Sequence, residues 1–292
     1  MLAFGKMTYN SKKWTLPSPH TVMECIEKWR KHDLRKMSDS EIDTELSNFL
    51  DSLEVYPVST TETQPFKFWR IRKFEYLFKD VSECWEPPSS KTPLGRCNSK
   101  CSPVLYVSDN LETPFEELNI QVGEPVYTIK YRVTDPLNLK RIVPKELITT
   151  DENHKPIYDD QSMLSYQILR EFVRSEFLKP VGKGTEYLHK ISSSMCRVWF
   201  HSDESDGWLY PSVQSNKNNI ALKPESARKK IEIKDIRIVR LVQKEHVSNH
   251  IHKFRAHPFY NLVSMAIETD FKGKVEKDVI TWSPSTEIGG IF

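Results

Sequence analysis

Apolar residues recur at intervals of three and four along two stretches early in the chain, as they do on one face of an amphipathic helix. The recurring positions are Val22, Ile26 and Trp29 in the first stretch, and Ile42, Leu46, Phe49 and Leu53 in the second. Ser18-Pro19 precedes the first stretch as an N-cap followed by proline, and Ser38 with Glu41 forms a capping box before the second. We therefore expect a helical N-terminal extension over residues 1–60 and a Thr-, Ser- and Pro-containing linker at 56–65.

Alternating apolar residues replace the helical spacing from residue 66 onward, which is typical of half-buried strands. The expected strands lie at 66–72, 104–107, 127–133, 196–200 and 236–241. Helical patterns lie at 112–119, 161–178 and 258–268. Four prolines and one glycine make residues 86–103 a long structured loop, a feature that often carries function. Because strands and helices are mixed without a regular βαβ period, the pattern predicts an α+β fold.

The composition narrows the class of protein. Of the 292 residues, 38% are hydrophobic, which is enough for a core. The net charge is only +2, so nucleic acid is not an expected partner. No apolar run approaches 18 residues, and the amino terminus lacks the apolar region of a secretory signal, so we expect no membrane partner. Five cysteines, an odd number, favour a reduced, cytoplasmic setting over a disulfide framework.

No metal site is expected. Cys97 and Cys101 lie four apart, but the chain has no second pair and no histidine close to them in sequence. Four further histidines cluster near the carboxy end, without a carboxylate or cysteine that would anchor a metal, and this favours a solvated helix. These histidines are His246, His250, His252 and His257.

The proline-rich loop holds the first candidates for binding chemistry. Arg96 follows Gly95 directly, and its guanidinium is a fork that matches two phosphate oxygens, while glycine permits close backbone approach. Asn98 can fix the loop or donate to a ribose hydroxyl. Tyr106, ten residues after Arg96, offers a flat ring for nicotinamide or adenine. Each has an ordinary alternative: a surface ion pair for Arg96, and a ring packed in the sheet for Tyr106.

Two later residues complete the set. Glu117 lies on the expected helix after the Tyr106 strand, and a carboxylate there can stabilise an oxocarbenium-like state, although Glu116 beside it leaves the assignment ambiguous. Ser212 follows Tyr210-Pro211, and its hydroxyl can hold a phosphate or position a nucleophile. The sequence shows no Ser-His pairing that would supply a general base to Ser212, so we do not expect this serine to be the nucleophile itself. Asn219, seven residues on, is a candidate for the pocket wall.

Seven segments resemble, in order and spacing, the RES domain family, named for its Arg, Glu and Ser. They are Phe68-Trp69-Arg70, Trp85-Glu86-Pro87-Pro88, Gly95-Arg96-x-Asn98, Pro103-Val104-Leu105-Tyr106, Thr113 to Glu117, Asp206-Gly207-x-x-Tyr210-Pro211-Ser212 and Asn218-Asn219-Ile220-Ala221. We place the RES domain at 66–243 and a C-terminal extension at 244–292. The resemblance implies an ADP-ribosyltransferase-like fold with a small mixed β-sheet.

The resemblance also implies the chemistry. It implies NAD as substrate, cleaved at the nicotinamide bond by water or phosphate, with no cofactor. By this likeness the catalytic residues are Arg96, Tyr106, Glu117 and Ser212, and the substrate-binding residues are Arg70, Asn98, Tyr210 and Asn219. Arg72 is a further pocket candidate with less support.

The same resemblance bears on partners and role. Many members are toxins neutralised by a helix-turn-helix antitoxin, so we expect such an antitoxin or another neutralising protein; a homo-oligomer stays open. Cys97 stands where an aromatic residue is common, and Pro114 where a small one is common. Both terminal extensions are foreign to the short toxin members. These departures leave room for a longer, defence-type effector.

Three rival functions stand beside NAD cleavage. The first is transfer of ADP-ribose to a protein or nucleic acid. The second is a binding module that senses a nucleotide without turnover. The third is a ribonuclease, because Arg240 and His246 are spaced like the Arg–His pair of HEPN ribonucleases, a spacing that also arises often by chance.

Overall fold

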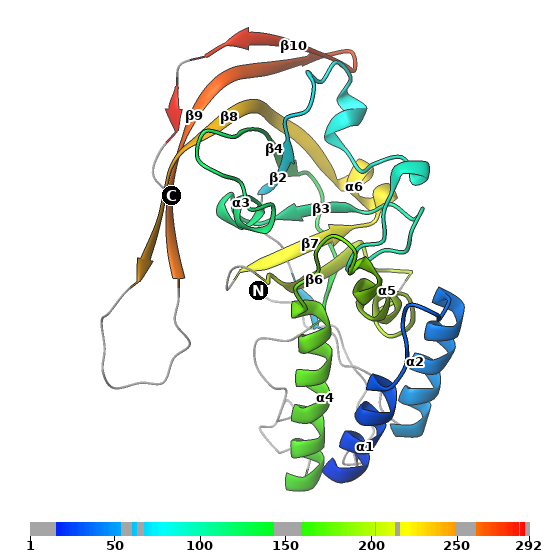
Figure 1. Ribbon diagram of the computed structural model, residues 1–292. Coiled ribbons are helices and arrows are strands. Elements are labelled where there is room, and N and C mark those ends of the chain that lie inside the picture. The colour runs from blue at the N-terminus through cyan, green and yellow to red at the C-terminus, as the bar shows by residue number, and fades with distance from the viewer. Residues whose placement is uncertain are drawn as a thin grey trace, which may run out of the picture.

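The computed structural model describes residues 16–53, 60–62, 67–142, 159–201, 203–213, 217–248, 261–285 and 287–289. Strands and helices form the expected α+β architecture, with a long curved sheet above a group of helices (Figure 1). The α-helices are α1 (Pro19–Arg30), α2 (Asp39–Leu53), α3 (Glu112–Glu117), α4 (Asp160–Leu178), α5 (His189–Val198) and α6 (Pro224–Lys230). Short 3-10 helices are η1 (Val81–Cys84), η2 (Ser89–Lys91) and η3 (Glu186–Leu188).

One sheet of eleven strands runs through the described residues, in the order β1-β5-β6-β7-β3-β2-β4-β8-β9-β10, with β11 paired to β9. The strands are β1 (Thr60–Glu62), β2 (Lys67–Lys73), β3 (Leu105–Ser108), β4 (Pro125–Val133), β5 (Leu139–Arg141), β6 (Gly207–Pro211), β7 (Asn218–Leu222), β8 (Ile231–Ser248), β9 (Asn261–Glu276), β10 (Val279–Pro284) and β11 (Ile288–Gly289). The pair β5–β6 is parallel and the other pairs are antiparallel, so the sheet is mixed, as expected. It is larger than the small sheet expected, because β8 to β11 extend it.

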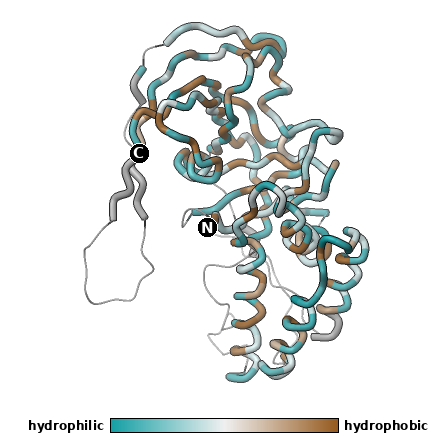
Figure 2. The backbone as a smooth tube through the Cα atoms, viewed as in Figure 1, coloured by the Kyte–Doolittle hydropathy of each residue, from teal (hydrophilic) through white to brown (hydrophobic). Residues whose placement is uncertain are grey.

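The two faces of the sheet belong to different cores. Along β3, Leu105 and Val107 pack with one cluster, whereas Tyr106 packs against the cluster that includes the helices. This alternation follows from the two-residue period of a strand. In Figure 2, apolar and polar stretches follow one another along the helix α4. The face that carries Tyr106 is the one on which the candidate residues gather.

The N-terminal helices form as their sequence predicts. Ser18 caps α1 by accepting from the Thr21 backbone N–H, and the Ser38–Glu41 capping box opens α2. The described residues of their apolar stripes are buried and pack with α4 and α5 in a single cluster: Val22, Ile26, Trp29, Ile42, Leu46 and Phe49. The Trp199 Nε1–H also donates to the Leu46 carbonyl at 3.1 Å. None of the helices in the described ranges has the length and apolar character that a membrane span needs.

Two expected elements are wrong. Residues 189–198 form helix α5, so the strand expected at 196–200 does not exist. Residues 261–268, expected to end a helix, belong to strand β9; residues 258–260 lie outside the described part of the chain. Within the linker expected at 56–65, residues 60–62 form the short strand β1, and the linker's other residues lie outside the described ranges.

Candidate functional site

The loop that precedes β3 closes around the hydroxyl of Tyr106. This hydroxyl donates to Asn98 Oδ1 at 2.8 Å and accepts from the Cys97 backbone N–H at 3.0 Å. Asn98 is buried, and its Nδ2 donates to the carbonyls of Pro93 and Ser99, each at 2.8 Å. Asn98 therefore fixes the loop, the first of the two roles expected for it. Burial raises the pKa of Tyr106 well above its usual value, so its hydroxyl stays protonated as a donor.

Arg96 projects from this loop to the end of α4. Its Nη1 donates to the Phe177 carbonyl at 2.7 Å, and its Nη2 donates to the Lys179 carbonyl at 3.0 Å. The last carbonyls of a helix carry partial negative charge, so a cation is favourable there. These two bonds hold the guanidinium in place, and its other N–H groups make no hydrogen bond to a described residue. Arg96 is thus oriented by the end of α4.

Glu117, at the end of α3, receives three hydrogen bonds on one oxygen. Its Oε1 accepts from the Ser212 hydroxyl, from the Val213 backbone N–H at 3.2 Å and from Asn219 Nδ2 at 2.9 Å. Residues from α3, β7 and the end of β6 therefore fix this carboxylate. These contacts place Glu117 in one cluster with Ser212 and Asn219. The Ser212 hydroxyl contacts the Glu117 carboxylate directly.

Tyr210 links the two groups. Its ring lies edge-on to Tyr106, with centroids 6.4 Å apart, and 6.0 Å from the ring of Phe177, whose carbonyl holds Arg96. Burial raises the pKa of Tyr210 well above its usual value; the Glu117 carboxylate adds to the rise and the Arg96 cation opposes it. Its hydroxyl makes no hydrogen bond to the described residues, which leaves it available to a ligand. Tyr210 therefore packs against both Tyr106 and Phe177.

Arg70 is not brought together with the other candidates. It shares a face of β2 with Phe68, on the side of the sheet away from Tyr106, because strand side chains alternate. Its Nη1 donates to the Cys84 carbonyl at 3.1 Å and to the Trp85 carbonyl. Arg70 thus anchors the turn after η1, and Arg72, on the same face, donates to the Glu83 carbonyl at 2.6 Å.

Two residues near the cluster were not singled out from the sequence. His189 opens α5; burial and, to a smaller extent, the nearby Arg96 cation lower its pKa to about 4. No motif surrounds His189, so no sequence signal marks it.

Trp69 is half-buried and lies opposite Ser108 of the neighbouring strand β3, and Ser108 lies opposite Asn219 of β7. The three residues therefore lie side by side across the sheet, on the face that carries Tyr106. The alternation of β2 signals this placement, because Trp69 must oppose Arg70.

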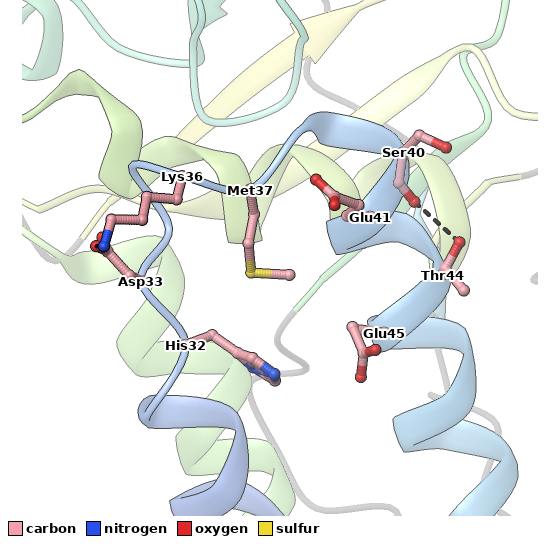
Figure 3. Close-up of a pocket in the computed structure, with 8 residues that line it drawn as sticks. All are labelled: His32, Asp33, Lys36, Met37, Ser40, Glu41, Thr44 and Glu45. Atoms are coloured by element: carbon pink, nitrogen blue, oxygen red, sulfur yellow. Dashed lines mark hydrogen bonds and ion pairs between the residues drawn. The ribbon is translucent and has the colours of Figure 1, made fainter.

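A groove of about 420 Å³ lies elsewhere, between the end of α1 and the start of α2 (Figure 3). It is lined by His32, Asp33, Lys36, Met37, Ser40, Glu41, Thr44 and Glu45. Figure 3 shows a hydrogen bond inside α2, from the Thr44 hydroxyl to the Ser40 carbonyl at 2.9 Å, among residues that cap and stabilise the helices. The groove shares no residue with the candidate cluster, so we place the chemistry where the charged and hydroxyl groups converge.

The remaining sequence hypotheses concern metals and histidines. Among the residues that the structure describes, no three His, Cys, Asp or Glu side chains gather as metal ligands. Arg240 lies in β8 and pairs with Asp270 at 3.1 Å. His246 belongs to strand β8, but its side chain lies outside the described part of the structure. The other three histidines of the cluster lie outside the described residues altogether.

Comparison with known proteins identifies the family. The family model described as the RES domain matches residues 67–242, more than half of the chain. The chain belongs to the RES domain family. No curated protein matches it. Among solved structures, a chain from the crystal structure of the M. tuberculosis MbcT-MbcA toxin-antitoxin complex matches at 12% identity and a TM-score of 0.34, covering 62% of this chain and 85% of that one.

The RES match contains every candidate residue of the site, from Arg70 to Asn219. Helices α1 and α2 precede it, and the groove in Figure 3 therefore lies outside the RES domain match. Strand β8 begins inside the match and continues beyond it to Ser248.

Proposed function

We propose that this RES-domain chain is an enzyme that cleaves the nicotinamide–ribose bond of NAD, with water or phosphate as the acceptor. We further propose a role as a toxin or defence effector that a partner protein neutralises. The family membership supports NAD as the substrate, because RES-domain members consume NAD. The single observation that carries the chemistry is the Glu117 carboxylate, held by three donors close to Tyr210.

Glu117 has the properties that this cleavage requires. The C1′–N bond breaks with its electron pair leaving on neutral nicotinamide, and the ribose develops oxocarbenium-like positive charge. A carboxylate fixed before the reaction stabilises that charge without having to reorganise. Water or phosphate then bonds to C1′; a water molecule gives up one proton to the solvent in this step.

Arg96 supplies the complementary charge for the rest of the substrate. NAD carries a negatively charged pyrophosphate, and Arg96 is already oriented by the carbonyls of Phe177 and Lys179. Burial raises the pKa of Tyr210, so this residue presents a protonated hydroxyl next to Tyr106. Tyr106 keeps the loop closed, and its ring is a wall of the site next to Tyr210.

Product analysis tests the proposal. The purified full chain is incubated with NAD, with and without phosphate, and the products are separated by chromatography. Nicotinamide with ADP-ribose indicates hydrolysis, and nicotinamide with ADP-ribose 1-phosphate indicates phosphorolysis; either result supports the proposal. If label from NAD appears on a macromolecule, the activity is ADP-ribosyl transfer and not cleavage by water or phosphate. Unchanged NAD under both conditions, with a thermal shift on NAD addition, would replace it with a binding module.

A further inference from the structure

An arginine and an aspartate join the N-terminal helices to the RES domain. Arg197 of α5 donates from Nη2 to Asp43 Oδ1 at 2.7 Å and from Nε to Asp43 Oδ2 at 3.1 Å, and Asp43 lies in α2. Two parallel bonds of this kind fix the orientation of a guanidinium. The side chains are 29% and 31% exposed, and an ion pair at such a position adds little to stability. Its geometry is therefore more informative than its energy.

The other end of the same guanidinium reaches the loop of the candidate site. Arg197 Nη1 donates to the hydroxyl of Ser99, and to the hydroxyl of Ser193 at 2.6 Å. Ser99 directly follows Asn98, whose Nδ2 donates to the Ser99 carbonyl at 2.8 Å. Asn98 in turn accepts from the Tyr106 hydroxyl. An unbroken series of hydrogen bonds thus runs from α2 to Tyr106.

We propose that Asp43 is a positioning residue for the loop at 95–99, so that the N-terminal extension is a working part of the site. This inference rests on the proposed function for its kinetic consequence. Asp43 holds two of the guanidinium nitrogens of Arg197, and Arg197 in turn holds the Ser99 hydroxyl. Arg96 lies in the same loop, so a displaced Ser99 displaces the group that we expect to bind pyrophosphate.

The chain offers a matched control for this role. Arg35 also joins the extension to the RES domain: its Nη2 donates to the Tyr187 hydroxyl at 3.1 Å, and its guanidinium lies 4.8 Å from that ring. Among the described residues, no contact of Arg35 leads to the loop at 95–99. Arg35→Gln therefore removes a contact between the N-terminal extension and the RES domain without changing the loop at 95–99.

The kinetic test compares NAD cleavage by the full-length wild type, Asp43→Asn, Ser99→Ala, the double variant and Arg35→Gln. We expect Asp43→Asn to lower kcat about tenfold, because misplacing a binding group by a fraction of an ångström already weakens catalysis. The double variant should lose no more than the stronger single variant, because both act through Arg197. Arg35→Gln should keep the wild-type kcat. Wild-type kcat in Asp43→Asn, or losses that multiply in the double variant, would overturn the inference.

A second readout separates this inference from the proposed function. Amide hydrogen exchange of residues 95–101 should be faster in Asp43→Asn than in the wild type and unchanged in Arg35→Gln. A wild type that leaves NAD intact would contradict the proposed function, and exchange would still decide the positioning role. Unchanged exchange in Asp43→Asn would refute that role even if the wild type cleaves NAD.

Discussion

At the scale of single residues, the loop around Tyr106 depends on Gly95, because its surroundings leave no room for a side chain. A Cβ on Gly95 would lie 2.4 Å from Asn98 Oδ1 and 2.7 Å from the Tyr106 hydroxyl oxygen. Both distances are far below van der Waals contact, so the loop closes around Tyr106 only because residue 95 is glycine. The sequence indicated that Gly95, beside Arg96, allows another group to approach the backbone closely. It did not indicate that this group is the side chain of Asn98 or Tyr106, because the fold brings them there.

Replacing this glycine should loosen the loop. We expect Gly95→Ala to lower the free energy of unfolding by about 1–3 kcal/mol, the usual cost of inserting a methyl group into packed surroundings. At Gly182 a Cβ would meet nothing within 4 Å, so Gly182→Ala should change it by less than about 1 kcal/mol. Urea denaturation followed by circular dichroism measures both. Equal stabilities of the two variants would contradict the close packing at Gly95.

His189 makes stability depend on pH. Its folded pKa is about 4, below the ordinary value of 6.5, so the unfolded chain binds its proton first as the pH falls. The stability that neutral His189 contributes is therefore present above pH 6.5 and is lost as the pH falls toward 4. We expect the free energy of unfolding of His189→Asn to fall less steeply over this range than that of the wild type. His20 on α1 is 81% exposed, so His20→Asn serves as the control with the wild-type slope. A wild-type slope in His189→Asn would refute the assignment.

From the sequence, spacing and chemistry indicated which candidate residues lie close together, but not on which face of a strand each of them lies. The order and spacing of Arg96, Tyr106, Glu117 and Ser212 were legible, and these residues do gather on one side of the sheet. Arg70 was expected beside them because of the resemblance of its segment to the RES domain. Strand alternation instead puts it with Phe68 on the other face, where backbone carbonyls satisfy it.

At the scale of elements, the errors come from short apolar patterns that fit two periods. Cys196 and Phe200 alternate as a strand would, but Ile191 and Met195 recur at helical spacing and are buried with α2 and α4. Residues 261–268 are apolar enough for either element, and pairing with β8 over its whole length decides for a strand. Long periodic segments such as α4 were predictable because their own apolar spacing identifies the type of element, without help from neighbouring elements.

The helical assignment of residues 189–198 makes a stability prediction. Met195 is fully buried between α5 and its neighbours, so we expect Met195→Ala to cost about 2–5 kcal/mol of unfolding free energy. Met23 on α1 is 50% exposed, and Met23→Ala should change stability by no more than about 0.5 kcal/mol. Chemical denaturation compares the two. Similar losses for both would argue against the burial of α5.

At the scale of the whole molecule, the parts outside the RES match are joined to it by shared structure. Helices α1 and α2 share one core with α4 and α5, and Asp43 connects them to the loop of the site. At the other end, β8 passes the boundary expected at residue 243 as one strand, and Trp282 Nε1–H of β10 donates to the Phe78 carbonyl at 2.8 Å. The sequence predicted helices before the domain and further residues after it. It could not predict these contacts, because they join residues up to about 200 positions apart in the chain.

The central claim is that this molecule uses one fixed carboxylate to cleave NAD, and two adjacent residues allow a direct measurement. Nicotinamide release is followed for the wild type, Glu117→Gln and Glu116→Gln under identical conditions. We predict release by the wild type, a loss of about 10²–10³-fold in kcat for Glu117→Gln, the scale of one preorganised electrostatic group, and near wild-type kcat for Glu116→Gln. Full activity of Glu117→Gln, or a wild type that releases no nicotinamide, would contradict the claim.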